Sequence, residues 1–407
     1  MASESMSGSK YFSLILILGS LTALGPFTID MYLPGFPAIA KDLHTDVSTV
    51  ALTLSSYFIG ISAGQLLYGP LLDRFGRKPP LYAGLALYIA TSIGCVFVNT
   101  IDGLIALRFL QAVGSCAATV AAMAMVRDLF PVNQTAKVFA LLMLVVGASP
   151  MVAPTIGGYV TSAMHWHVVF IILCGMGVAI LLSTIFWLPD SYKPDTSLSL
   201  KPKPIILNFV AVVKEPLFYT YAFSGAVAFS ALFAYVSGSP KVFMNVFGLS
   251  DKAYGWVFAL LSVGFIGSNQ LNSLLLRWFE STQIVPVALA GQVVAGLLFV
   301  IGSMNGWFGL YGTIIVLFVL LSCLGLILPN MSALALRPFE RNAGSASSLL
   351  GALQMGMGAL ASVVVSLFEE MSAVPMAGTM AAAAVLALLI LLIGRRSSVR
   401  AGSPPLS

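Results

Sequence analysis

Two charged residues interrupt otherwise apolar stretches of the sequence, and both belong to types that can move protons or bind a charged ligand. Asp30 lies four residues before Pro34, and Arg108 begins the segment RFLQAVGSC. Charged side chains inside an apolar segment are unfavourable, so they usually face a protein interior or a water-filled path and have a function. A partly buried carboxylate also takes up a proton more readily. We therefore predict that Asp30 carries a proton or contacts a ligand, with Arg108 and Gln111 facing the same cavity.

An ordinary helix-end carboxylate is the alternative for Asp30. If a helix begins near Tyr11, Asp30 lies roughly 29 Å along it, close to the far side of a bilayer. Against this, Asp30 is the only acidic residue inside the apolar segments defined below, and Arg108 is the only basic residue that does not lie at the very end of one. Two lone opposite charges at similar depth favour a shared cavity over contact with lipid.

The composition places the chain among integral membrane proteins. Of its 407 residues, 58% are hydrophobic and only 9% are charged. Soluble domains have about 25% charged residues, so this chain cannot cover a globule of its size with polar groups. The net charge of +5 reflects where basic residues lie relative to the bilayer and does not indicate a nucleic-acid partner.

Cysteine and histidine residues give no sign of a metal or cofactor site. The four cysteines each fall in an apolar stretch, and none has the spacing of a metal-binding pair. The segment HWH at 165–167 offers two histidines without further ligands, which is more typical of residues at a membrane interface. We expect no metal and no cofactor.

Apolar runs predict twelve membrane-spanning helices, because a helix needs roughly 20 apolar residues to cross a bilayer. The first six are expected near 11–34, 47–71, 80–98, 103–127, 137–160 and 167–188. A polar stretch over 189–204 interrupts the pattern. Six further spans are expected near 216–240, 252–276, 284–302, 308–333, 344–368 and 374–394.

This layout predicts an all-α fold of two pseudo-symmetric six-helix halves. The segments LLDRFG (71–76) and LLLRWF (274–279) occupy equivalent places in the two halves, as in transporters built from repeats. The expected domains are a first bundle (1–188), a cytoplasmic linker loop (189–215) and a second bundle with a short cytoplasmic tail (216–407). Most of the 20 lysine and arginine residues fall on one side, which predicts cytoplasmic termini.

The segment GPLLDRFGRK (69–78) is the sharpest pattern in the sequence. It joins two spans and contains Gly69, Asp73, Arg74, Gly76 and Arg77 in a fixed order. Glycine permits a tight turn and a close approach of helices. The aspartate suits a helix N-terminus, and the arginines can reach carboxylates. Such a cluster would hold helix ends together in one state and release them in another.

A second pattern lies in the fifth span, where Pro150 and Pro154 are one turn apart. Gly147, Gly157 and Gly158 flank them. Proline removes a backbone donor and bends a helix, and glycine lets a neighbouring helix approach closely. Simple packing is the alternative explanation, since both residues are common in membrane helices.

These patterns together resemble the major facilitator superfamily. GPLLDRFGRK is similar to its signature loop, RFLQAVGSC to its Arg-x-x-Gln-Ala-x-Gly motif, and GASPMVAPTIGG (147–158) to its antiporter motif. DMYLP (30–34), VRDLF (126–130) and ALRPFERNAGSASSLLGALQ (335–354) are similar to the bicyclomycin-resistance (Bcr/CflA) branch of drug exporters. The resemblance spans nearly the whole chain.

The resemblance implies proton-coupled multidrug efflux by alternating access in the bacterial inner membrane, a role in antibiotic resistance, and no enzymatic activity. It implies that Asp30 takes part in proton coupling, and that Arg74 or Arg77 pairs with Asp128 in a cytoplasmic gate. Some related exporters carry a second acid two turns before the first. Here that position is Thr22, which argues against export of doubly charged cations.

Residues that contact the substrate are harder to assign. Candidates for the cavity wall are Phe27, Tyr32, Tyr57, Phe233 and Gln354, although packing or lipid contact explains each equally well. The expected partners are a small drug-like molecule, protons and the lipid bilayer, with no nucleic acid and a monomeric chain.

Import of a sugar or other small metabolite with protons is the alternative function on the same fold. The antiporter-like motif at 147–158 and the few polar groups of the expected cavity argue against it. A membrane-embedded enzyme is disfavoured because the sequence has no phosphate-binding loop or zinc-protease motif. A passive channel is disfavoured because it would not need two pseudo-symmetric halves.

Overall fold

The computed structural model describes residues 8–130, 132–192, 194, 202–339, 343–368 and 370–400, and these ranges contain helices and no strand. Twelve helical segments are long and apolar enough to cross a membrane. The twelve spans expected from the sequence are therefore confirmed as helices, and the chain is an all-α, multi-pass membrane protein.

The first half of the chain contains helices α1 to α7. Their bounds are α1 Gly8–Asp30, η1 Leu33–Gly35, α2 Phe36–Asp42, α3 Val47–Phe75, α4 Lys78–Phe97, α5 Ile101–Leu129, α6 Val132–Ala163 and α7 His167–Trp187. The first membrane span continues from α1 through η1 into α2. Pro34 lies in the short η1 turn, which leaves Asp30 at the end of α1.

The second half begins after a short additional helix, α8. The bounds are α8 Pro202–Val213, α9 Pro216–Phe218, η2 Tyr219–Phe223, α10 Ser224–Pro240, η3 Lys241–Val246, α11 Asp251–Leu275, α12 Ser281–Met304, α13 Leu310–Leu336, α14 Ala343–Ser366 and α15 Val374–Arg400. Helix α10 and its flanking segments α9, η2 and η3 form one span, Pro216–Val246.

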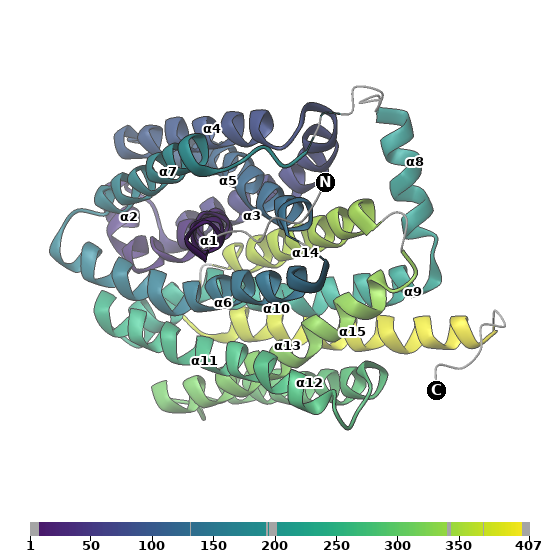
Figure 1. Ribbon diagram of the computed structural model, residues 1–407. Coiled ribbons are helices and arrows are strands. Elements are labelled where there is room, and N and C mark those ends of the chain that lie inside the picture. The colour runs from purple at the N-terminus through teal and green to yellow at the C-terminus, as the bar shows by residue number, and fades with distance from the viewer. Residues whose placement is uncertain are drawn as a thin grey trace.

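The two halves lie side by side and meet along four helices. In Figure 1 the first half, coloured purple to teal, lies above the second half, coloured green to yellow. Helix α3 packs against α14, and α6 packs against α11. These two helix pairs form what we call the border between the halves, and most of the residues discussed below lie on it or behind it.

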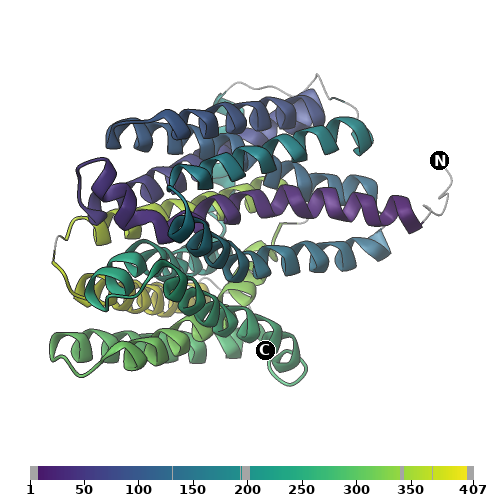
Figure 2. The ribbon, with the colours of Figure 1, turned by 90° about the vertical axis from the view of Figure 1, so that its left-hand side faces the viewer.

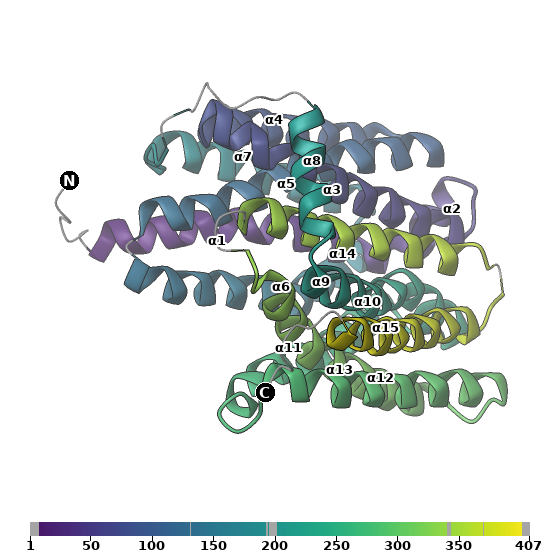
Figure 3. The ribbon, with the colours of Figure 1, turned by 90° about the vertical axis from the view of Figure 1, so that its right-hand side faces the viewer.

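The segment expected as a continuous cytoplasmic loop contains helix α8. Figures 1 and 3 show this helix running across the direction of its neighbours, between the two halves. Its 12 residues reach only about 18 Å, too short to cross a bilayer. Proline at its first position suits a helix start, and an apolar run follows it in the helix.

Short capped turns connect the spans at the end of the bundle opposite the α3–α4 loop. Asp46, Thr100 and Ser250 precede α3, α5 and α11, and each accepts a hydrogen bond from a backbone N–H in the first turn. Such caps satisfy amides that the helix leaves unpaired. We call this the capped end, and we call the end with Arg74, Arg77 and Lys78 the basic end. Figure 2 shows the long helices running between them.

Candidate functional site

Arg108 lies at the centre of a buried polar network inside the first half. Its side chain is fully buried, and its guanidinium lies 4.2 Å from the ring of Tyr32 and 4.3 Å from that of Tyr57. Its Nη1 donates to Gln111 Oε1 at 2.6 Å, and its Nη2 donates to the carbonyl of Thr28 at 3.0 Å. Because the guanidinium is planar and has several N–H donors, it can stack on the two tyrosine rings and still donate to the two acceptors.

The network continues through neutral side chains into α4. Gln111 Nε2 donates to Ser92 Oγ at 2.7 Å, and the hydroxyls of Thr28 and Tyr88 are 2.8 Å apart. Helices α1, α4 and α5 are therefore tied together around Arg108. Because the last carbonyls of a helix lack intrahelical partners and carry partial negative charge, a cation near Thr28 stabilises the end of α1. Arg108 thus fixes the helix end that carries Asp30.

Asp30 lies on the border between the halves rather than within the Arg108 network. It is only 5% exposed, and its charge acts on Tyr235 of α10 and Tyr254 of α11. Within the described ranges, no residue forms an ion pair or a hydrogen bond with the Asp30 carboxylate. The expected cavity shared by Asp30 and Arg108 is not among the cavities described below.

Two tyrosine hydroxyls of the second half are close enough to Asp30 for its charge to act on them. Tyr254 Oη lies 2.8 Å from Ser239 Oγ, whereas the buried Tyr235 Oη has no hydrogen-bond partner in the described part of the chain. A buried carboxylate without a partner is a group that can accept a proton or a polar ligand group.

The five predicted cavity residues occupy different surroundings. Tyr32 and Tyr57 are buried around Arg108, their hydroxyls bond to Thr53 and Ser115, and they line neither of the two cavities described below. Phe233 lies on the border, with its ring 4.3 Å from that of Phe58. Gln354 is half-buried on α14.

Phe27 faces a different direction, toward a groove between α1, α6 and α7. This groove has a volume of about 420 Å³, and its wall also includes Phe12, Leu16, Val145 and Met176. Phe12 and Leu16 are more than half exposed. In a membrane protein such an apolar outer groove faces lipid, so Phe27 is not placed with the other candidates.

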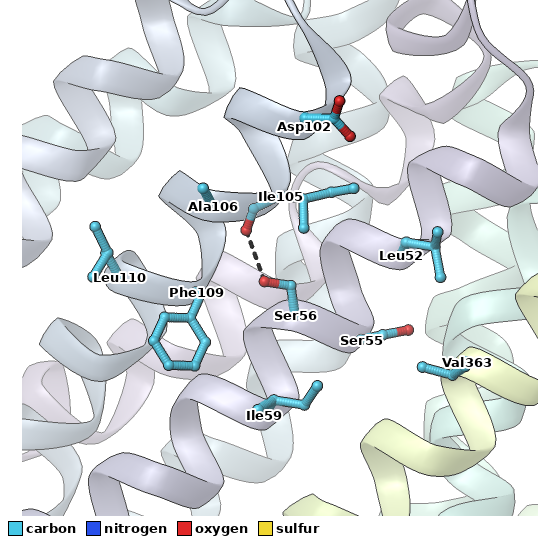
Figure 4. A pocket seen from close by; sticks show the side chains of 10 residues that line it. All are labelled: Leu52, Ser55, Ser56, Ile59, Asp102, Ile105, Ala106, Phe109, Leu110 and Val363. Atoms are coloured by element: carbon cyan, nitrogen blue, oxygen red, sulfur yellow. Dashed lines mark hydrogen bonds between the residues drawn. The ribbon is translucent and has the colours of Figure 1, made fainter.

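The larger of the two described cavities also opens on the outside of the bundle. It measures about 690 Å³ and lies between α3 and α5, with Val363 of α14 at one edge (Figure 4). Ser56 Oγ donates to the carbonyl of Ile105 at 2.7 Å, and Asp102 is the only charged residue in the wall. Ile59 and Leu110 are more than 40% exposed. None of the predicted proton or substrate residues lines this cavity.

The predicted gate residues come together at the basic end. Arg77 Nη1 lies 2.7 Å from Asp73 Oδ1, and Arg77 Nε lies 2.8 Å from Asp128 Oδ2. These hydrogen bonds and ion pairs keep the pKa of Arg77 above its usual value, although burial opposes them. The Tyr192 ring lies 4.2 Å from the guanidinium. We call Asp73, Arg77, Asp128 and Tyr192 the Arg77 cluster.

Arg77, rather than Arg74, is the partner of Asp128. Gly76 makes this possible, because its φ of +84° ends α3 in a conformation that favours glycine. The Arg77 cluster joins segments of the first half to Tyr192 at the start of the linker. Among the described contacts at this end, Gly69 reaches the other half, where an added Cβ would lie 3.3 Å from Ser348 Oγ of α14.

The proline- and glycine-rich part of α6 makes close backbone contacts, some with the first half and some across the border. A Cβ at Gly157 would overlap the carbonyl oxygen of Met31, and one at Gly158 would overlap that of Asp251. The carbonyl of Pro150 accepts a hydrogen bond from Ser262 Oγ at 3.4 Å. The carbonyl of Pro154 lies against Gly255, and Gly147 faces Ile266. The backbone of segment 147–158 therefore contacts the backbone of α11 and that of Met31, in the turn between α1 and η1.

The sequence of this chain matches the Major Facilitator Superfamily over residues 18–362. The chain belongs to this superfamily. It is 32% identical to a bicyclomycin resistance protein homolog of Haemophilus influenzae, over 93% of this chain and 95% of that protein. The resemblance to the bicyclomycin-resistance branch is thus confirmed.

Other relatives carry names from drug resistance. The chain is 27% identical to a chloramphenicol resistance protein of Pseudomonas aeruginosa, over 89% of this chain and 85% of that protein. It is 29% identical to the multidrug resistance protein MdtL of Escherichia coli, over 83% of this chain and 84% of that protein. These names describe the relatives.

Solved structures share the fold. A D-xylose–proton symporter superimposes with a TM-score of 0.74 at 13% identity, covering 94% of this chain and 97% of that one. A bacterial homolog of the lysosomal transporter Spinster gives 0.76 at 13% identity, covering 98% and 100%. The two six-helix halves of this major facilitator protein are therefore an established transporter architecture.

Lys241 is a site residue of this major facilitator protein that the sequence did not reveal. Its Nζ donates to Ser48 Oγ at 3.0 Å and to the carbonyl of Phe368 at 2.8 Å, which links η3 to α3 and to the end of α14 at the capped end. Ser48 and Lys241 are separated by 193 positions, and no local pattern connects them.

Replacing Arg108 by lysine is expected to lower the stability of the transporter. Lysine keeps the charge but cannot stack flat between Tyr32 and Tyr57 while reaching both acceptors. Loss of one charge-assisted hydrogen bond corresponds to about 2 kcal/mol. Thermal unfolding in detergent measures the effect, with the exposed Arg277→Lys as control. Equal stability of both variants would show that the network does not hold α1.

Replacing Asp128 by asparagine is expected to loosen the Arg77 cluster, because the partly buried Arg77 then keeps only Asp73 as an ionic partner. The expected loss of unfolding free energy is about 1–2 kcal/mol. The control is Asp190→Asn, whose partner is Lys78 and whose side chain is 86% exposed, with an expected loss below about 1 kcal/mol. A loss no larger than the control would contradict the assignment.

Proposed function

We propose that this transporter exports small amphipathic compounds from the bacterial cytoplasm in exchange for protons. The termini would lie in the cytoplasm, with the basic end inside and the capped end outside, and the chain would act as a monomer. The bundles over 1–188 and 216–407 would be the two moving bodies. The names of the relatives support efflux, and the positive-inside rule supports the orientation.

The observation that carries the proposal is the placement of Asp30. It is a buried carboxylate without a partner among the described residues, and it lies on the surface along which the two halves meet. A transporter that exchanges a proton for a compound needs one group that can bind either of them in turn. Asp30, whose charge acts on Tyr235 of α10, meets this requirement.

In the proposed cycle, Asp30 takes a proton from the outside and the compound leaves outward. The carrier then rocks inward, Asp30 loses its proton to the cytoplasm, and a new compound binds. The contacts of Lys241 with Ser48 and of Gly158 with Asp251 join the halves at the capped end, which would correspond to a state closed toward the outside. The Arg77 cluster would keep the basic end of the first half rigid and help to close it in the opposite state.

The experiment that tests the proposal uses inverted membrane vesicles loaded with a pH-sensitive dye and energised to form a proton gradient. Addition of cationic or neutral amphipathic drugs is expected to discharge the gradient only when the transporter is present. A symporter would behave differently, because sugar added to right-side-out vesicles would carry protons inward. Sugar-driven proton uptake without any drug response would replace export by import.

A further inference from the structure

We propose that Asp42, His165 and His167 bind one divalent transition-metal ion at the capped end of the protein. The sequence offered only the two histidines at this place, and for that reason no metal was expected. The fold adds a carboxylate from the end of α2. One ligand atom from each of the three side chains lies within 4.8 Å of the others, and this set is separate from the Asp30 region.

The histidine pair lies at hydrogen-bond distance, close to the spacing that two ligands of one ion require. His165 Nδ1 and His167 Nδ1 are 2.6 Å apart. Two neutral imidazole nitrogens can face each other at this distance only with a proton or a cation between them. In a tetrahedral zinc site with bonds of about 2.0–2.1 Å, ligand atoms are roughly 3.3 Å apart. Small side-chain rotations would bring the three ligands to that spacing.

Trp166 holds the ligands in place. Its Nε1 donates to Asp42 Oδ2 at 3.0 Å, and its ring is stacked on His167 with centroids 3.6 Å apart. The rings of His165 and His167 are stacked as well, at 4.6 Å. Trp166 itself is only 2% exposed. Neighbouring groups that fix the orientation of ligands raise metal affinity, because less side-chain freedom is lost on binding.

The donor set indicates the class of ion. Two imidazoles and one carboxylate suit zinc and similar transition metals, whereas magnesium and calcium prefer oxygen ligands throughout. Asp42 and His165 are exposed, so water can supply a fourth ligand. Binding would join the end of α2 to the start of α7, and α2 continues the span that contains Asp30.

The test measures zinc binding to the full-length protein in detergent, after removal of any histidine tag and of bound metal with a chelator. Zinc is titrated against a competing chromophoric chelator, and cobalt is used to record the visible spectrum of the site. We expect one ion per chain. His165→Phe and His167→Phe keep the ring stack but remove a ligand, and each is expected to weaken binding at least about tenfold.

His44→Asn is the matched control. His44 lies in the turn between α2 and α3, outside the ligand set, and its φ of 51° is a conformation that asparagine tolerates. This variant is expected to bind zinc as the wild type does. Asp42→Asn provides a second ligand variant that keeps an oxygen acceptor for Trp166. Unchanged zinc binding in the three ligand variants, or equal weakening in the control, would overturn the proposed site.

Discussion

Replacing Asp30 by asparagine is expected to abolish the discharge of the proton gradient by drugs in inverted vesicles. Asparagine has nearly the same shape as aspartate but cannot exchange a proton. Because no other acidic residue was placed inside the spans, no second group is expected to replace it. The protein should still fold, since the Asp30 carboxylate makes no hydrogen bond or ion pair with the described residues.

Asp46→Asn is the control for this experiment. Asp46 is exposed and caps α3 by accepting a hydrogen bond from the Thr49 amide at 2.9 Å, and asparagine caps helices equally well. The control is expected to discharge the gradient at the wild-type rate.

Binding of a cationic compound gives an independent measurement of the same residue. In the wild type, affinity should fall as the pH is lowered, because the proton and the compound compete for one carboxylate. In Asp30→Asn, the affinity for the compound should be lower, and it should no longer fall as the pH is lowered. Wild-type discharge by the variant would show that the proton moves through another group.

Replacing Gly157 by alanine is expected to reduce drug-driven proton release at least about tenfold, which corresponds to 1.4 kcal/mol. The new methyl group would overlap the carbonyl oxygen of Met31, which is backbone and cannot rotate away. Helix α6 must then move away from Met31, the residue that follows Asp30 in the chain. Overpacking of this kind typically costs about 1–3 kcal/mol.

Two further alanine variants make the comparison specific. Gly158→Ala would overlap the carbonyl oxygen of Asp251, so it is expected to behave like Gly157→Ala. At Gly147 the added methyl would lie 3.6 Å from the side chain of Ile266, an ordinary contact, and transport should stay near the wild-type rate. If all three variants transport alike, the close contact at the capped end has no part in the cycle.

The sequence predicted the spans well because each apolar run is about twenty residues long. Twenty consecutive apolar residues leave little choice of structure, and each of the twelve expected spans is a helix. Helix α8 could not be recognised in the same way, because its 12 residues begin in the polar stretch 189–204 and fall below the length that a membrane requires.

The side-chain partners were harder to predict, because hydropathy gives the depth of a residue but not the direction in which it points. Asp30 and Arg108 have similar depth, yet Arg108 faces the interior of the first half and Asp30 faces the second half. Helix spacing does not explain the Asp73–Arg77 pair either, because α3 ends at Phe75 and Gly76 turns the chain before Arg77. Nothing local connects Lys241 with Ser48.

The contacts of Gly158 with the carbonyl oxygen of Asp251 and of Gly255 with that of Pro154, both across the border, have a consequence for the free energies of the transport states. Side chains that pack across a surface lose rotamer freedom each time it closes, about 0.5–2 kcal/mol for a flexible one. Glycine and backbone oxygen lose none. A seam built from main-chain atoms can therefore open and re-form repeatedly with little entropic penalty, and it keeps the closed and open shapes close in free energy.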